Sequence, residues 1–234
     1  MFHAAARPAI VPSPAYHTDR DGDEKVQRDQ RLPLLDAADL TYSYPGRPEP
    51  ALKGASLRIE VGDRVLLQGP SGSGKTTFAA LLAGLKQPSS GLLLLGGLDW
   101  HTLGPAGWRR RVAAAPQYND NHVLTATLAF NLLMGRAWPP APGDVEEAEA
   151  VCRELGLGEL LGRMPGGMAQ MVGESGWRLS HGERSRLFIA RALLQRARLI
   201  VLDESFAALD PETLERCLRC VMARAAALIV IAHP

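Results

Sequence analysis

Eight consecutive residues have the types and the spacing that hold a chain of phosphates. The run Gly69-Pro70-Ser71-Gly72-Ser73-Gly74-Lys75-Thr76 fits the pattern G-x-x-x-x-G-K-S/T at every fixed position. Glycine accepts positive φ, so successive N–H groups and the N-terminus of a following helix can converge on one anion. We therefore expect a nucleoside triphosphate site in which Lys75 bridges the β- and γ-phosphates and Thr76 holds Mg²⁺, with Thr77 next in the binding segment.

The segments on either side of this run favour a real binding loop. Val65-Leu66-Leu67 predicts a buried strand, and the residues from Thr77 to Leu85 have a helical pattern. A chance match in a glycine-rich turn is the alternative, and the strand-loop-helix context argues against it. The motif alone does not separate kinases, GTPases, helicases and transport ATPases, because all of them use the same loop.

Two acids follow a second apolar strand. Asp203 and Glu204 come directly after the aliphatic run Leu199 to Leu202, which is typical of a central parallel strand. This puts both carboxylates at the carboxyl edge of the sheet, beside the phosphate loop. We expect Asp203 to orient Mg²⁺ and its waters, and Glu204 to act as general base on the attacking water. A solvated acidic turn is the alternative, and the upstream phosphate loop makes it less favoured.

Composition limits the choice of class. The 234 residues allow one large α/β domain, or a core with a smaller subdomain. A net charge of +1 gives no global field that would recruit nucleic acid, so we expect no nucleic-acid partner. The apolar runs are shorter than the roughly 20 residues that cross a bilayer, which favours a soluble chain. Three cysteines suggest a reducing compartment; the C-x-x-C pair Cys217 and Cys220 lies in a predicted helix without a second pair for zinc.

The chain divides into a leader and one ordered domain. Residues 1–33 contain several prolines and a mixed-charge run, and we expect them to be a disordered leader or linker. The ordered domain is expected at 34–234, with a helical subdomain near 118–195. Gly62-Asp63 is expected to make a hairpin-like turn between two strands. Apolar strands are predicted at 40–44, 55–61, 65–68, 92–95, 111–115, 199–202 and 227–231.

Three helices carry start signals. Asp144 with Glu147, and Ser180 with Glu183, have the spacing of a capping box. Asp210-Pro211 combines a capping acid with proline at the first helical position, and this helix is expected to run to about Arg224. The stretch from about 125 to 195 is expected to be mostly helical.

Taken as a set, the segment from Tyr44 to His233 resembles the ATP-binding cassette of ABC transporters. Leu179-Ser180-His181-Gly182-Glu183 is similar to the family signature L-S-G-G-Q. The resemblance implies that Ser180 and Gly182 contact the γ-phosphate held by an opposite cassette. His181 and Glu183 depart from the pattern: the histidine adds a Cβ, and the carboxylate should weaken phosphate binding unless the helix dipole, Arg184 or Arg186 offsets it.

The resemblance assigns further residues. Gln117 matches the Q-loop glutamine that reaches Mg²⁺, and His233 matches the switch histidine that contacts the γ-phosphate. Tyr44 matches the aromatic residue that stacks on adenine, with a tyrosine on a hydrophobic patch as the alternative. Residues 207–210 resemble the D-loop of the dimer interface. Residues 173–176 resemble the X-loop typical of exporter-type cassettes, and 127–133 resemble the exporter segment after the Q-loop.

Fold, ligands and partners follow from this resemblance. It implies an α/β P-loop NTPase fold with a mostly parallel central sheet, an antiparallel β subdomain and a helical subdomain. It implies an ATPase of the exporter type that uses ATP and Mg²⁺ and is coupled to transport. It also implies that the chain lies peripherally on the cytoplasmic face of the cell membrane. The implied partners are a transmembrane permease and a second ATP-binding cassette, identical or different.

Two other hypotheses stay open at this point. One is a soluble ABC-type ATPase that acts on nucleic acid or the ribosome; such proteins usually have a long coiled-coil insertion or tandem cassettes, and the sequence shows neither. The other is a remnant module that binds nucleotide without productive transport. It is motivated by a chain that stops at His233-Pro234 and by a leader that resembles a linker.

Overall fold

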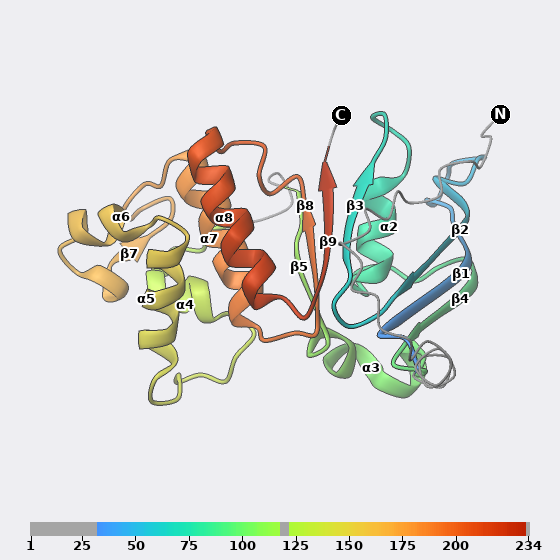
Figure 1. Cartoon of the computed structure of the whole chain (residues 1–234), viewed down its shortest axis with the longest axis horizontal. Helices are drawn as coiled ribbons and strands as arrows, with labels where there is room; N and C mark the ends of the chain where they lie inside the picture. The colour runs from blue at the N-terminus through green and yellow to red at the C-terminus, as the bar shows by residue number, and fades with distance from the viewer. Residues whose placement is uncertain (1–31, 118–121, 233–234) are drawn as a thin grey trace, which may run out of the picture.

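The computed structural model describes residues 32–117 and 122–232. The predicted leader therefore falls almost wholly outside the described residues. A parallel sheet stands at the centre of the described part (Figure 1). Its four strands there pair in parallel in the order β3-β9-β8-β5, as the sequence predicts for the central sheet. Their bounds are β3 (Arg64–Gln68), β9 (Ala227–Ala232), β8 (Leu199–Asp203) and β5 (Val112–Ala115).

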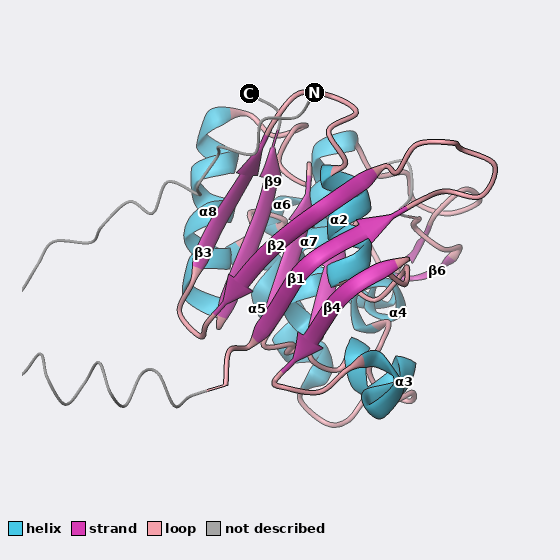
Figure 2. Ribbon diagram, turned by 90° about the vertical axis from the view of Figure 1, so that its right-hand side faces the viewer, coloured by secondary structure: helices cyan, strands magenta, loops and turns pink. Residues whose placement is uncertain are grey.

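A second sheet is antiparallel and forms its own layer. Within the described residues it has the order β2-β1-β4. Figure 2 looks onto this sheet with α2 (Lys75–Leu82) behind it, and Figure 1 places α2 between the two sheets. Together with the helices on the far side, these layers confirm the predicted fold class. The antiparallel strands are β1 (Leu35–Tyr42), β2 (Leu52–Ile59) and β4 (Ser90–Leu95).

Strand β8 is buried on both faces. Leu199 and Val201 pack into the core shared with α2 and the antiparallel sheet, whereas Ile200 and Leu202 pack into the core on the opposite face. Side chains alternate between the two faces of a strand, so a strand covered on both sides needs an unbroken apolar run. The run ends at Asp203, where the chain leaves the sheet among the loops that bind anions in such folds.

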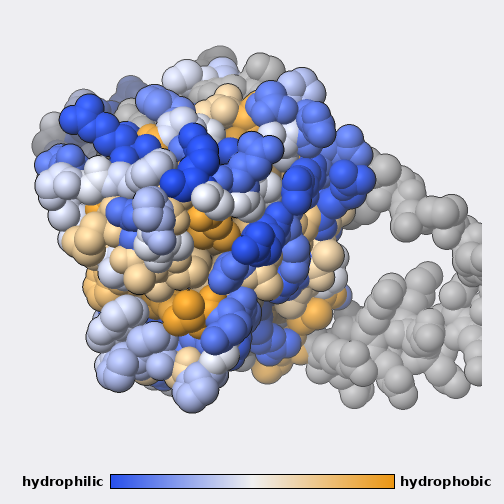
Figure 3. Space-filling view, turned by 90° about the vertical axis from the view of Figure 1, so that its left-hand side faces the viewer, coloured by the Kyte–Doolittle hydropathy of each residue, from blue (hydrophilic) through white to orange (hydrophobic). Residues whose placement is uncertain are grey.

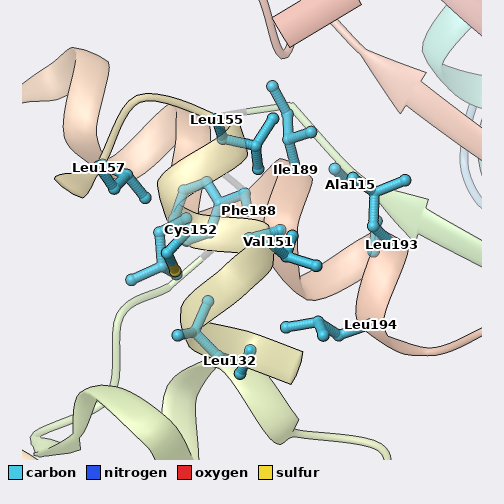
Figure 4. Packing of buried hydrophobic residues seen from close by; sticks show 14 of the residues in the cluster. Ala115, Leu132, Val151, Cys152, Leu155, Leu157, Phe188, Ile189, Leu193 and Leu194 are labelled. Atoms are coloured by element: carbon cyan, nitrogen blue, oxygen red, sulfur yellow. The ribbon is translucent and has the colours of Figure 1, made fainter. Parts of the chain in front are cut away.

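The helices on the far face build a separate core. Figure 4 shows Leu132 of α4, Val151 and Cys152 of α5, and Phe188 of α7 packed against one another, and all of them are buried. This core holds the N-terminus of α7 at a set place relative to the sheet. The helices of this part are α4 (Leu128–Leu133), α5 (Asp144–Glu154), α6 (Gly158–Arg163), the 3-10 turn η2 (Gly167–Ala169), α7 (His181–Leu194) and α8 (Pro211–Arg224).

The surface on the helical side is mixed. Figure 3 shows apolar patches surrounded by hydrophilic side chains on this face. None of the helices in the described ranges has both the length and the apolar composition that crossing a bilayer requires.

The turn at Gly62-Asp63 was expected to close a hairpin, and this prediction is wrong. The strands on its two sides enter different sheets: β2 pairs with β1, and β3 pairs with β9. Gly62 N donates to Ala226 O at 2.8 Å, and Leu228 N donates to Asp63 O at 2.9 Å. These bonds join the turn to the start of β9, so it passes the chain from one sheet to the other. Local turn chemistry does not reveal which strand becomes the partner.

Several element bounds also differ from expectation. Helix α2 begins at Lys75, two residues before the predicted start, because the loop glycine Gly74 serves as its N-cap. Helix α3 (Trp100–Arg109) was not predicted; Gly104 and Pro105 interrupt its pattern. The largely helical stretch also holds a two-residue strand pair, β6 (Ala126–Thr127) with β7 (Met171–Val172), which is too short to produce a sequence period.

Helix starts were predicted at the right places, for partly different reasons. Ser180 and Glu183 form the predicted capping box of α7. Helix α5 begins at Asp144, but its N-cap is Gly143 and no side chain caps it. Asp144 instead accepts a hydrogen bond from Ala141 N at 2.9 Å and pairs with Arg136. Its carboxylate therefore stabilises the loop before the helix rather than the first turn.

Candidate functional site

The phosphate loop lies between β3 and α2. Gly72 and Gly74 have φ of 78° and 86°, which is the left-handed region where a side chain is strained. A Cβ at Gly74 would lie 2.6 Å from the carbonyl oxygen of Ala51. The glycine is therefore required twice, for its backbone conformation and for the close approach of the segment before β2.

The ammonium group of Lys75 folds back over this loop. Its Nζ donates to Gly69 O at 2.7 Å and to Pro70 O at 2.9 Å, and lies 3.4 Å from Ser73 Oγ. The chain's own oxygens thus hold the positive charge over the loop. A phosphate oxygen can take the place of these acceptors without moving the backbone that carries the lysine.

One cavity of about 320 Å³ brings most of the predicted residues together. It joins parts of the chain that are far apart in sequence: the loop after β1, the phosphate loop, the end of β5 and the end of β8. Its lining residues are Tyr44, Arg47, Ala51, Ser71, Gly72, Ser73, Gly74, Lys75, Thr76, Thr77, Gln117 and Glu204.

Tyr44 is fixed at one wall of the cavity. Its hydroxyl lies 3.1 Å from Thr77 Oγ1, within hydrogen-bond distance, and its ring meets Tyr42 edge-on at 5.0 Å. Lys86 Nζ lies 4.9 Å from the Tyr44 ring centroid, and Arg47 Cζ lies 5.5 Å from it. The ring is therefore an oriented aromatic surface beside the phosphate loop, and cations already rest against it.

Glu204, which also lines the cavity, has a strained backbone. Its φ is 51°, a left-handed conformation that is uncommon for a residue with a side chain. The bond from Glu204 N to Ile231 O at 3.0 Å ties this residue to the end of β9. Gln117 Nε2 donates to Glu204 Oε2 at 2.6 Å, so the structure brings the two predicted residues into direct contact. Asp203, one residue earlier, is 2% exposed at the end of β8.

The donor set of this edge suits a hard divalent cation. Thr76 contributes a hydroxyl oxygen, Gln117 an amide oxygen and Asp203 a carboxylate, and these oxygen ligands are the type that Mg²⁺ prefers. Thr76 is the second residue of α2 and ends the phosphate-loop motif. Gln117 follows β5 and Asp203 ends β8, so these two stand at the carboxyl ends of neighbouring strands. The residues present therefore fit Mg²⁺.

The turn before α7, residues 179–183, lies elsewhere. Ser180 is exposed at the N-cap of α7, and its Oγ accepts a hydrogen bond from Glu183 N at 3.2 Å. Gly182 is part of the same turn. Neither Ser180 nor Gly182 is among the described residues that line the cavity. The structure thus brings the phosphate loop, Tyr44, Gln117 and Glu204 together in one chain and leaves this turn apart from them.

The charge of Glu183 was expected to be offset by the helix dipole, Arg184 or Arg186. Arg184 Nε donates to Leu179 O at 3.3 Å, and Arg186 Nε donates to Gly182 O at 3.1 Å. The Glu183 carboxylate pairs with Arg163, which ends α6. A side chain twenty residues upstream was not visible as a partner in the local pattern.

Other parts of the prediction fall outside or beyond the cavity. His233 lies outside the described residues. Arg47 and Ala51 line the cavity but were not singled out from sequence, because they lie in a loop with no residue pattern. The proline-bounded segment 45–50 was the only available signal for a loop at this place.

Comparison with known proteins identifies the family. The ABC transporter family model matches residues 52–207, which is more than half of the chain. The chain belongs to the ABC transporter family. Residues 69–76, 117, 180–182 and 203–204 all lie inside the matched region. ATP hydrolysis is the activity that membership of this ATPase family implies, and domains of the family bind ATP, generally with Mg²⁺.

The relatives that the chain matches are longer than the chain itself. The chain is 41% identical over 189 residues to the mycobactin import ATP-binding/permease protein IrtB of Mycolicibacterium thermoresistibile. The matched region covers 81% of this chain and 31% of that protein. It is 38% identical to the ABC multidrug transporter MDR2 of Trichophyton rubrum, over 82% of this chain and 14% of that protein. It is 37% identical to the ATP-dependent lipid A-core flippase of Chromobacterium violaceum, over 83% and 32%.

A solved structure gives the same placement. A bacterial Atm1-family ABC exporter with ATP bound superposes with a TM-score of 0.76 and 30% identity, covering 88% of this chain and 35% of that one. The chain spans about a third or less of the length of these proteins. This ABC transporter chain is therefore homologous to the ATP-binding domains of exporter-type proteins. Because one relative is named as an import protein, "exporter-type" describes the domain and not a direction of transport.

Proposed function

We propose that this chain binds and hydrolyses ATP with Mg²⁺ and that it powers transport through a transmembrane permease partner. In this proposal it acts with a second ATP-binding cassette on the cytoplasmic face of the cell membrane. Residues 34–234 form the ATP-binding domain, with residues of about 118–195 as its helical subdomain. The ABC family match and the exporter-type relatives support the proposal.

One observation carries the proposal: a single cavity joins the phosphate loop to Tyr44, Gln117 and Glu204. A triphosphate with its base and its metal needs an anion cradle, an aromatic surface, oxygen ligands and a general base within one site. Separate motifs in a sequence satisfy this need only if the fold brings them together. Here four distant segments meet at the carboxyl edge of the parallel sheet.

The binding roles follow from the contacts. The N–H groups of Ser71 to Thr77, at the N-terminus of α2, receive the phosphates, and Lys75 exchanges its loop carbonyls for phosphate oxygens. Tyr44 presents its ring to the adenine. Thr76, Gln117 and Asp203 hold Mg²⁺, which when bound neutralises charge on the phosphates.

Glu204 is the proposed catalytic base. Its carboxylate lines the cavity, and Gln117 Nε2 orients it through the bond of 2.6 Å. In the reaction, Glu204 accepts a proton from the water that attacks the γ-phosphorus, while the bond from that phosphorus to the β–γ bridging oxygen breaks. Lys75 stabilises the charge on the departing phosphates. His233 is proposed to contact the γ-phosphate, and the bond between Glu204 N and Ile231 O supports this by holding the end of β9 beside the base.

The second cassette follows from the place of the α7 turn. Ser180 and Gly182 are proposed to bind the γ-phosphate of another chain, because within one chain they stand apart from the cavity. Triphosphate then satisfies both surfaces, whereas diphosphate leaves the turn of the second chain without its ligand. The difference in binding free energy between these states drives the pair to close and to separate.

The test is hydrolysis by the purified chain and by Glu204→Gln. We expect the parent to release phosphate from ATP only with Mg²⁺, and the variant to bind ATP with parent-like affinity while its turnover falls by about a hundredfold or more. The variant should also accumulate as an ATP-bound dimer in light scattering. Turnover near the parent rate in Glu204→Gln would remove Glu204 as the base. Binding without any hydrolysis by the parent, even when concentrated, would favour a non-hydrolysing nucleotide module instead.

A further inference from the structure

Glu183, which stands where the family signature has glutamine, takes part in the fold through its carboxylate. Glu183 is largely buried, and its two carboxylate oxygens have different partners. Oε2 accepts a hydrogen bond from Ser180 N at 2.7 Å and closes the capping box. Oε1 accepts one from Arg163 Nη2. The carboxylate that should repel a phosphate is therefore already engaged with a positive charge.

A second arginine, Arg186, holds the backbone of the same turn. Arg186 Nε donates to Gly182 O at 3.1 Å, and its Nη1 donates to Gly156 O at 2.7 Å, in the connection between α5 and α6. Arg163 ends α6 itself. Both links therefore join the turn before α7 to the α5–α6 segment, one through a backbone carbonyl and one through the Glu183 carboxylate.

The two links differ in what they can supply. Arg186 donates hydrogen bonds to two backbone carbonyl groups and so fixes the backbone of the turn relative to the α5–α6 connection. The Arg163 side chain is 59% exposed, and an ion pair at such a place contributes little to the stability of the fold. Its contribution grows where water is excluded around a second charge, because the effective dielectric constant falls there.

We propose that Arg163 is a positioning residue for the γ-phosphate of the second cassette: it neutralises and orients Glu183 so that the Ser180 turn accepts this anionic ligand. This inference rests on the proposed function, because it needs two cassettes that share one triphosphate. The pair of Arg163 with Glu183 replaces, in this chain, a neutral amide with an ion pair of zero net charge. The departure from the family signature is thus compensated by a side chain on another helix.

The proposal makes a specific prediction about two substitutions combined. Arg163→Ala leaves the Glu183 carboxylate facing the incoming phosphate without its partner, so the dimer should weaken by about tenfold. Glu183→Gln keeps an oxygen that can cap Ser180 N and removes the charge, so it should dimerise at least as well as the parent. In the double variant the loss caused by Arg163→Ala should disappear.

The experiment measures dimerisation of the full chain by analytical ultracentrifugation with Mg²⁺ and a non-hydrolysable ATP analogue. We expect the double variant to lie within about twofold of Glu183→Gln, and Arg163→Lys to lie near the parent. The defect of Arg163→Ala should shrink as salt is raised, since screening weakens charge repulsion. Arg153→Ala is the matched control. It removes the same charge, and Arg153 pairs with Glu149 on the exposed side of α5.

Nucleotide affinity of the dilute monomer separates this inference from loss of folding. It should be the same in parent and Arg163→Ala, since Arg163 does not line the cavity. Parent-like dimerisation by Arg163→Ala overturns the inference, and so does a double variant as weak as Arg163→Ala. In both cases the proposed function survives. A parent that binds the analogue and never dimerises contradicts the shared-site mechanism itself, and this inference with it.

Discussion

The phosphate loop and the turn before α7, which we propose as its counterpart from a second chain, are built in different ways. The loop depends on its own residues: Gly72 and Gly74 take left-handed φ, and Lys75 is held by carbonyls five and six residues away. The α7 turn depends on other helices, because Glu183 is paired with Arg163 and Gly182 O is bound by Arg186. One surface is complete within a short segment, whereas the other is assembled by tertiary contacts.

This difference explains how each surface tolerates sequence change. In the loop, a Cβ at Gly74 meets backbone and cannot be accommodated by a neighbouring side chain. In the turn, a Cβ at Gly182 would lie 3.5 Å from Ala208 O, an ordinary contact distance, and an altered charge is balanced by an arginine twenty residues upstream. The loop matches its motif at every fixed position, whereas the turn departs from the family pattern at His181 and Glu183. The predictions below test whether the two surfaces act on separate steps.

Lys75→Ala should have the largest effect, and only on the first surface. Removing the ammonium group deletes charge-assisted bonds to the phosphates, so ATP affinity should fall by about a hundredfold. A fluorescent-nucleotide titration measures it, with Lys53→Ala on the exposed side of β2 as the control. Thermal unfolding without nucleotide shows whether the loop itself survives. Unchanged binding in Lys75→Ala would contradict the assignment of the loop.

Tyr44→Ala should reduce ATP affinity less, by about tenfold, because the stacking of a base on one aromatic ring contributes about 1 to 3 kcal/mol. Tyr44→Phe is the matched control: it keeps the ring and loses the contact between the hydroxyl and Thr77 Oγ1. The same titration with GTP extends the test to base selectivity. If Phe and Ala lower the affinity equally, the hydroxyl and not the ring is what matters at this wall.

Ser180→Ala should leave the first surface intact and weaken the second. The monomer should bind ATP as the parent does, whereas the ATP-dependent dimer should weaken by about tenfold, since we propose that the hydroxyl and the fixed turn bind the γ-phosphate of the second chain. Loss of a helix cap also lowers stability by about 1 kcal/mol. Asp99→Ala controls for this, because Asp99 caps α3 through Thr102 N at 2.8 Å and belongs to neither surface. Equal dimerisation defects in the two variants would mean that general stability explains the result.

The same contrast shows what could be predicted from sequence. The aliphatic run before Asp203 and the glycine pattern at 69–76 report constraints that act within a few residues, and both gave the correct element and place. The partner of β3 could not be predicted from the turn at Gly62-Asp63, because it is a strand more than 160 residues later. Nor could Arg163 or Arg47 be singled out, since each acquires its role only when distant segments meet.

The strain at Glu204 belongs to this second group. Its left-handed φ occurs where its N–H bonds to Ile231 O, on the strand that joins the sheet last in sequence order. The contact with Gln117 likewise joins the ends of β5 and β8. Sequence reasoning named both residues individually, and only the fold gives the distance between them.

The smallest expected effect concerns how α7 is held at its other end. Arg136 Nε donates to Leu194 O at 2.6 Å, and Arg136 and Arg196 both bind the Glu147 carboxylate. The hydrogen bond from Arg196, together with that from Arg136, lowers the pKa of Glu147 from 4.5 to about 2. A carboxyl group whose pKa is lower in the folded state stabilises the fold above its unfolded pKa, and this stabilisation is lost as pH falls toward the folded pKa.

We therefore expect Glu147→Gln to destabilise the chain by about 1 kcal/mol at pH 7, and by less as the pH is lowered from about 5 toward 2, where the parent loses the same interaction. Chemical unfolding across this pH range measures the difference, with Glu149→Gln on the exposed side of the same helix as control. Hydrogen exchange should show α7 amides losing protection in acid before those of α2, because this arginine network braces only the helical side. A difference in unfolding free energy between parent and Glu147→Gln that does not change with pH would show that the charge of Glu147 is not what holds α7. Simultaneous loss of protection in α7 and α2 would show that the two surfaces are not mechanically separate.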